Sequence, residues 1–144
     1  MSIWSIASNA SAWRGYEYYQ QGKVTSYTTL CDDVFESYIQ GSADAPYHTV
    51  INISHPRNSQ CNCPFAKDRR VACKHMVALL FSVRPSEAEA YMRAIEESEM
   101  EYERWRQEHY RDIEQYVRDL SKDDLRNQLV NALIELDERG DRYW

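Results

Sequence analysis

The feature that most constrains this chain is a set of four residues in two tight pairs. The sequence reads Cys61-Asn62-Cys63 and, after nine intervening residues, Cys73-Lys74-His75. Three thiolates and one imidazole make a Cys₃His set, which is typical of tetrahedral structural zinc sites. Pro64 directly follows the first pair, and the apolar run 76–81 follows the second. The pattern therefore predicts a zinc ion that joins a turn after a short strand to the first turn of a helix.

Other roles for the cysteines are less well supported by the pattern. Cys61 and Cys63 are too close together to form a disulfide easily. The N-terminal residues 1–13 lack the basic and apolar parts of a signal peptide, which favours a reducing cytoplasmic location. Buried inert thiols are the remaining alternative for the motif cysteines. Cys31 lies outside the motif, and we expect it to be a small apolar residue at a strand end rather than a functional thiol. No apolar run approaches the roughly 18 residues needed to span a membrane.

The charge of the chain is unevenly distributed. The net charge of −6 divides into −3 for residues 1–54, +5 for residues 55–85 and −8 for residues 86–144. The basic segment 55–85 surrounds the two metal-ligand pairs, and its charge has two interpretations. One or two cations near the zinc would stabilise the thiolates, whereas a larger set could bind a partner or phosphate groups. The candidate residues are Arg57, Lys67, Arg69, Arg70, Lys74 and Arg84.

The N-terminal part has the pattern of a helix followed by strands. A helical face over residues 13–20 is followed by Gly22, which suits the left-handed position after a helix. The β-branched and aromatic residues then predict strands over 24–30, 34–40 and 47–54. Short connections favour an antiparallel meander of three to four strands. The expected fold class is therefore α+β.

The C-terminal part is expected to be helical. There is no Pro or Gly from Ser86 to Arg139, and a capping-box spacing places a helix start at Ser86. The apolar periodicity predicts one long helix, or two with a break near 109–112, and then a further helix from Ser121 that stops at Gly140. This gives two or three helices.

Aromatic residues recur along the first of these helices. We expect this stripe to pack on the core of the domain, because that is the usual fate of aromatic residues at helical spacing. The alternative is a dimer interface formed by the C-terminal helices. The residues are Tyr91, Tyr102, Trp105 and Tyr116.

Two domains are expected from these patterns. Residues 1–84 form the zinc-binding domain, and residues 85–144 form an acidic helical extension. The first domain comprises a lead-in helix and sheet over 1–54, the zinc motif over 61–75 and a helix over 74–84.

The zinc motif resembles a known family. Cys-x-Cys and Cys-x-His, together with Cys63-Pro64 and the run 73–80, are similar to the SWIM zinc finger. Residues 14–24 and the pair Gly41-Ser42 resemble the lead-in of stand-alone bacterial members. The resemblance covers roughly residues 10–82. It implies one structural zinc ion, with Cys61, Cys63, Cys73 and His75 as its ligands.

The function implied by the resemblance is binding. SWIM modules occur in Swi/Snf-class ATPases of bacteria, in Mutator-type transposases and in ubiquitin-ligase-like proteins. The sequence has no Walker A glycine loop, so a motor of that class would be a separate chain. Four protein ligands leave no open coordination position, which disfavours catalytic zinc. We therefore expect a non-enzymatic module that binds a protein partner. The alternative is a DNA- or RNA-binding module that uses the basic segment, accessory to a Swi/Snf-class ATPase.

Overall fold

A computed structural model of the chain describes residues 1–140. The chain divides into two compact units, Met1–Ile95 (unit 1) and Glu96 onward (unit 2). Helix α3 begins in unit 1 and ends in unit 2. The elements in chain order are η1 (Trp4–Ile6), α1 (Asn9–Gln20), β1 (Thr28–Cys31), β2 (Val34–Ile39), β3 (Tyr47–Asn52), η2 (Pro56–Asn58), β4 (Gln60–Cys61), α2 (Lys74–Val83), α3 (Pro85–Asp119) and α4 (Lys122–Glu138).

Helix α1 begins at Asn9, four residues before the predicted helical face, and ends where the sequence predicts. The Ser8 hydroxyl accepts a hydrogen bond from the backbone N–H of Ser11 at 3.2 Å, which satisfies one of the free N–H groups of the first turn. The helix ends at Gln20, and Gly22 follows with a φ of 63°. The predicted helix and its stop are confirmed.

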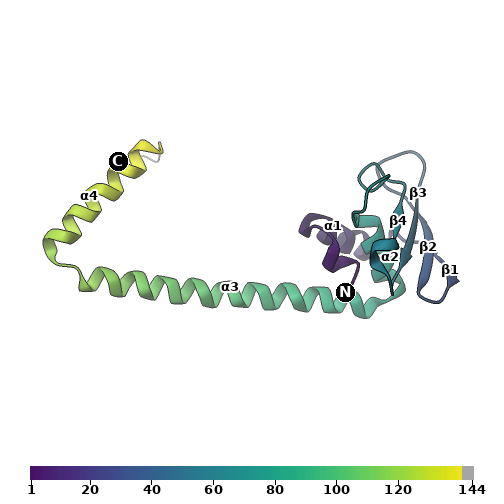
Figure 1. The fold of residues 1–144 in the computed structure, drawn as a ribbon, viewed down its shortest axis with the longest axis horizontal. Coiled ribbons are helices and arrows are strands. Elements are labelled where there is room, and N and C mark those ends of the chain that lie inside the picture. Colours follow the sequence, from purple (N-terminus) through teal and green to yellow (C-terminus); the bar gives the residue numbers. More distant parts are fainter. Residues whose placement is uncertain (141–144) are drawn as a thin grey trace. The chain divides into compact units, whose positions relative to one another are not determined.

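The four strands form one antiparallel sheet in the order β1-β2-β3-β4 (Figure 1). This meander and the α+β class confirm the prediction. Strands β2 and β3 pair over their full length, with Val34 opposite Asn52 at one end. Strand β4 is only two residues long and places Cys61 opposite Thr49. The sheet therefore brings the first cysteine of the motif against a buried residue of β3.

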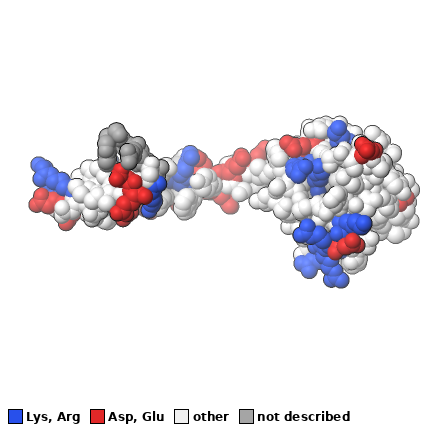
Figure 2. Space-filling view, turned by 90° about the horizontal axis from the view of Figure 1, so that it is seen from above, with Lys and Arg blue, Asp and Glu red and all other residues white. Residues whose placement is uncertain are grey.

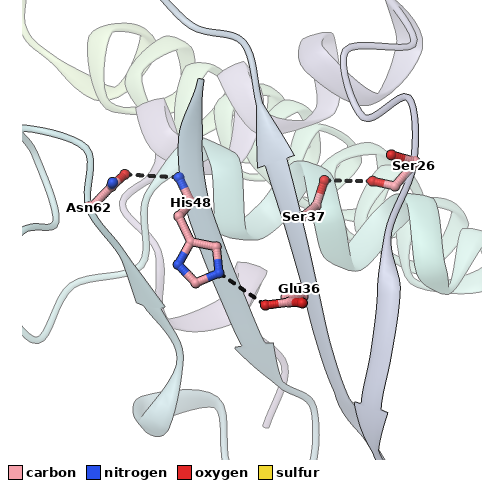
Figure 3. Close-up of polar contacts among 5 residues, drawn as sticks. All are labelled: Ser26, Glu36, Ser37, His48 and Asn62. Atoms are coloured by element: carbon pink, nitrogen blue, oxygen red, sulfur yellow. Dashed lines mark hydrogen bonds and ion pairs between the residues drawn. The ribbon is translucent and has the colours of Figure 1, made fainter. Parts of the chain in front are cut away.

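The first strand is shorter than the sequence predicts. It begins at Thr28 rather than at Val24. The segment before it is instead held by the Ser37 hydroxyl, which donates to the Ser26 carbonyl oxygen at 2.7 Å (Figure 3). In the turn that follows β1, Asp33 has a φ of 61°, a left-handed conformation that Asp tolerates better than most residues.

Helix α2 packs against one face of the sheet, and α1 packs on the other side of α2 (Figure 1). That face contributes Ile39 and Ile51, and α2 contributes Phe81, all fully buried. The two helices approach closely at Gly15, where an added Cβ would lie 2.5 Å from the Cβ of Val77. Helix α2 is therefore enclosed by the sheet and by α1, which explains why seven of its residues are buried.

The first turns of α3 complete this core. The helix starts at Pro85, one residue before the predicted start, and proline suits the first helical position. Ala88 and Tyr91 are buried, and the Tyr91 ring lies 5.5 Å from the ring of Trp4. The Trp4 indole Nε1 donates to the Glu87 carboxylate at 2.9 Å. The N-terminal segment is thus fixed to α3 inside unit 1.

Unit 2 consists of the rest of α3 and of α4. Helix α3 runs to Asp119 without the break that was one of the two alternatives at 109–112. The Ser121 hydroxyl accepts from the backbone N–H of Asp124 at 3.2 Å and caps α4. Gly140 follows α4 with a φ of 86°. Both the start and the stop of this last helix are as predicted.

The expectation that the whole aromatic stripe packs on a core is wrong. Only Tyr91 does so, whereas Tyr102, Trp105 and Tyr116 are 60%, 56% and 55% exposed. The reason is that unit 1 ends at Ile95, and unit 2 has no buried residue on α4 to pack against them. Among the described residues, no helix combines the length and apolar character needed to cross a lipid bilayer.

Candidate metal centre and basic groove

The four predicted ligands meet in the interior of unit 1. Cys61 ends β4, Cys63 follows it in the loop, Cys73 is the residue that precedes α2, and His75 lies in the first turn of α2. All four side chains are buried, and their ligand atoms lie within 4.8 Å of one another. The fold therefore joins the sheet edge to the start of α2 at one point.

The donor set and its spacing fit a tetrahedral zinc ion. The Nδ1 atom of His75 lies 3.7 Å from the Cys61 sulfur and 3.9 Å from the Cys73 sulfur. Zn–S and Zn–N bonds of about 2.3 and 2.0 Å at tetrahedral angles imply a sulfur–nitrogen separation of about 3.5 Å. Nδ1 is thus the histidine atom that would bind the metal. The ion would supply positive charge to three buried sulfurs and hold the two ligand pairs together.

Hydrogen bonds distribute negative charge unevenly among the three sulfurs. A bond from the Cys73 thiol lowers the pKa of Cys61 to about 4 and outweighs burial, which raises it; His75 and Thr49 add to the lowering. The Thr49 hydroxyl donates to the Cys61 sulfur at 3.2 Å. The pKa of Cys73 is raised by its bond to Cys61 and by burial, and burial raises the pKa of Cys63. A divalent cation removes this conflict, because it stabilises all three thiolates together.

Two tyrosines and a glycine hold the His75 ring in place. The Tyr47 ring lies 4.8 Å and the Tyr18 ring 5.6 Å from the ring of His75. A Cβ added at Gly41 would lie 2.5 Å from the Tyr47 ring and 3.1 Å from His75 Nε2. Nε2 is buried and has no hydrogen-bond partner among the described residues. Packing, rather than a second hydrogen bond, therefore orients this imidazole.

Comparison with known families supports the assignment of a zinc site to this segment. The family model of the SWIM zinc finger matches residues 47–84, a segment that includes all four ligands. These residues form a SWIM zinc finger. Its Cys₃His cluster is consistent with one structural zinc ion. No curated protein and no solved structure matches the chain.

Three residues that support the SWIM centre were not assigned to it from sequence. Thr49, Gly41 and Tyr47 contact ligand side chains, but they lie 12 or more residues before the first ligand. The alternation of the strand over 47–54 is a signal for Thr49, which it places on the buried face, and the resemblance of the pair Gly41-Ser42 to the family's lead-in is a signal for Gly41. Their roles depend on the β3–β4 register, which the sequence does not specify.

Four of the six basic candidates line one groove beside the SWIM centre. The groove has a volume of about 1030 Å³ and lies between the outer side of β3 and β4 and the turn after Cys63. Figure 2 shows Lys and Arg side chains gathered on one part of unit 1. We call this surface the basic groove. It contains one acidic residue, Asp68, and its cations are Arg57, Lys67, Arg69 and Arg70.

The turn that carries three of these cations is fixed to a metal ligand. The backbone N–H groups of Ala66 and Lys67 both donate to the Cys63 carbonyl oxygen, at 3.0 and 2.8 Å. Asp68 has a φ of 59°. The guanidinium of Arg69 lies 5.6 Å from the centre of the Phe65 ring. The positions of these three cations thus depend on the backbone at Cys63.

The other two basic candidates lie elsewhere. The Lys74 ammonium donates to the Tyr18 hydroxyl at 2.7 Å and lies over the Tyr18 ring. Arg84 forms an ion pair with Asp33. These two cations therefore have partners within unit 1 and do not contribute to the basic groove.

Proposed function

We propose that this chain is a non-enzymatic zinc-dependent interaction module and that unit 2 binds a protein partner. The SWIM zinc finger is a binding module, and a four-ligand zinc has no free position for water or substrate. The proposal includes a cytoplasmic setting, where thiolates persist in reduced form.

The observation that carries the protein role is the row of exposed apolar side chains on α3 and α4. Trp105 is 56% exposed and Leu129 is 58% exposed. Large contiguous apolar surfaces on water-exposed helices usually mark sites of protein association, and aromatic residues are frequent at the centres of such sites. The exposed set is Met100, Tyr102, Trp105, Tyr110, Ile113, Tyr116, Val117, Leu125, Leu129, Val130 and Ile134.

Affinity purification with nuclease treatment tests this function. The full chain should retain a defined protein partner after nuclease treatment, and a variant with Trp105→Ser and Leu129→Ser should lose it. A matched control with Arg118→Ser and Arg126→Ser changes two exposed polar positions on the same helices. Light scattering separates a second copy of the chain from a different protein. Retention of the partner by the apolar variant would contradict the role of unit 2.

A second function is favoured by the basic groove. Four cations and a single carboxylate line it, and nucleic-acid phosphates bind such surfaces with release of counterions. We propose DNA or RNA binding at this groove, in the manner of an accessory module to a Swi/Snf-class ATPase.

The nucleic-acid function is tested by binding at low salt. Changing Arg69 and Arg70 to Ala should weaken binding to every sequence and reduce its dependence on salt. Arg84→Ala is the control, since that arginine is paired with Asp33. No binding of DNA or RNA by the zinc-loaded chain at low salt would remove this function.

A further inference from the structure

The outer face of the sheet carries an exposed aromatic pair. Side chains alternate across a strand, so Tyr38 on β2 and His48 on β3 point away from the helices that cover the inner face. The two residues are opposite each other in the β2–β3 register. Their rings are stacked, with centroids 4.8 Å apart and planes at 28°. Tyr38 is 63% exposed, so it presents an aromatic surface to solvent.

Two polar contacts, one made by its ring and one made by its backbone N–H, fix the position of His48. Its ring Nε2 lies 3.1 Å from the Glu36 carboxylate, and its backbone N–H donates to the side-chain oxygen of Asn62 at 3.0 Å (Figure 3). Glu36, two residues before Tyr38 on β2, thus has its carboxylate engaged by His48. The pair is therefore held in one orientation before any partner binds.

The aromatic pair adjoins the basic groove. His48 and its neighbour on the same strand face, Val50, line that groove together with Arg57 and Lys67. The surface thus combines a flat aromatic group with cations on one side of unit 1. Stacking surfaces beside a positively charged groove are the common feature of sites for single-stranded nucleic acids.

We propose that this surface binds single-stranded nucleic acid, with phosphates in the basic groove and one base stacked on Tyr38. The inference rests on the nucleic-acid function proposed above and specifies the form of its ligand. The bases of a duplex are already stacked on each other and present only their edges. Only an unpaired base can lie flat on an exposed tyrosine ring.

The test measures binding of a fluorescent 15-nucleotide oligo-dT to the zinc-loaded full chain by anisotropy across a salt series. Tyr38→Ala should weaken binding roughly 5- to 150-fold, which is the loss of one stacked base. Its salt slope should stay unchanged, because no phosphate contact is removed. Tyr38→Phe should restore binding. Arg69→Ala with Arg70→Ala should instead lower the salt slope by about 1.4.

Controls separate this inference from the function on which it rests. Tyr27→Ala removes another exposed tyrosine of unit 1, 47% exposed, and should bind as the unchanged chain does. Zinc content and circular dichroism of each variant check the fold. Equal competition by a duplex of the same length, or unchanged binding by Tyr38→Ala, would overturn the inference and leave the groove function standing. If neither single strand nor duplex binds at low salt, both fail.

Discussion

At the scale of single residues, Thr49 connects the sheet to the metal centre. It is fully buried on β3, and its hydroxyl donates to the Cys61 sulfur. A buried hydroxyl needs such a partner, and a thiolate gains from a donor. One hydrogen bond therefore satisfies the buried hydroxyl on β3 and stabilises the thiolate of a zinc ligand.

Replacing Thr49 by Val should weaken zinc binding about 10- to 100-fold, the usual effect of removing a hydrogen bond to a metal ligand. The shape of the side chain is nearly kept, so the β3–β4 pairing should persist. Competition with a chromophoric chelator measures the affinity. Thr49→Ser keeps the donor and serves as the control. Zinc affinity equal to that of the unchanged chain in Thr49→Val would show that the bond has no role.

Zinc binding should also depend steeply on pH. The pKa values of Cys63 and Cys73 are raised, so each carries a proton at neutral pH before the metal binds, whereas Cys61, with a pKa of about 4, is already ionised. Binding must then release two protons, and lowering the pH makes their removal harder. The apparent affinity should fall about 100-fold per pH unit between roughly pH 8 and 7. Calorimetry in buffers of different ionisation enthalpy counts the protons, and release of none would contradict the assignment.

At the scale of elements, the contact between α1 and α2 is set by a glycine. Gly15 allows α1 to approach Val77 and the backbone at Lys74, where an added Cβ would lie 2.5 and 3.0 Å away. Since Val77 is fully buried and Lys74 opens the helix that carries His75, this contact positions the start of α2.

Gly15→Ala should lower the free energy of unfolding by about 1–3 kcal/mol, the usual cost of forcing extra atoms into a packed contact. Alanine favours a helix over glycine by only about 1 kcal/mol, so the clash should decide the sign. Denaturant unfolding of the zinc-loaded protein measures the effect. Arg14→Ala, at the exposed neighbouring position, is the control. A gain in stability would mean that α1 moves aside without cost.

Local sequence signals were sufficient to predict most helices and strands, but not the contacts that their side chains make with distant segments. Ligand types and spacing predicted the metal centre, because a helix start and a short strand are local features. The basic residues were predicted as one group, yet Lys74 and Arg84 have partners 56 and 51 residues away. The first strand begins late because Ser37 holds the preceding segment. Contacts between distant segments determine the partners of Lys74 and Arg84 and the start of the first strand. The pattern of a single sequence does not reveal such contacts.

At the scale of the whole molecule, the boundary between the units lies inside helix α3. Ala88 and Tyr91 belong to the core of unit 1, while the residues from Glu96 onward belong to unit 2. Unit 1, which contains the four ligands, therefore includes the first turns of α3.

A chain of residues 1–95 should fold and keep one zinc ion, whereas residues 1–84 should be much less stable. The shorter chain loses the buried Ala88 and Tyr91 and the hydrogen bond from Trp4 to Glu87. Removing a buried aromatic side chain alone costs about 3–5 kcal/mol. Thermal unfolding and zinc content compare the two chains. Equal melting temperatures would show that α3 contributes nothing to unit 1.

The turn that is hydrogen-bonded to the Cys63 carbonyl links the basic groove to the metal centre. None of the groove cations binds the metal, but three of them stand on a turn whose backbone hydrogen bonds end at a metal ligand. When a cell runs short of zinc, the loss of order at Cys63 would scatter these charges. If the basic groove binds nucleic acid as proposed, the affinity for that anionic partner would therefore fall when the zinc site is empty.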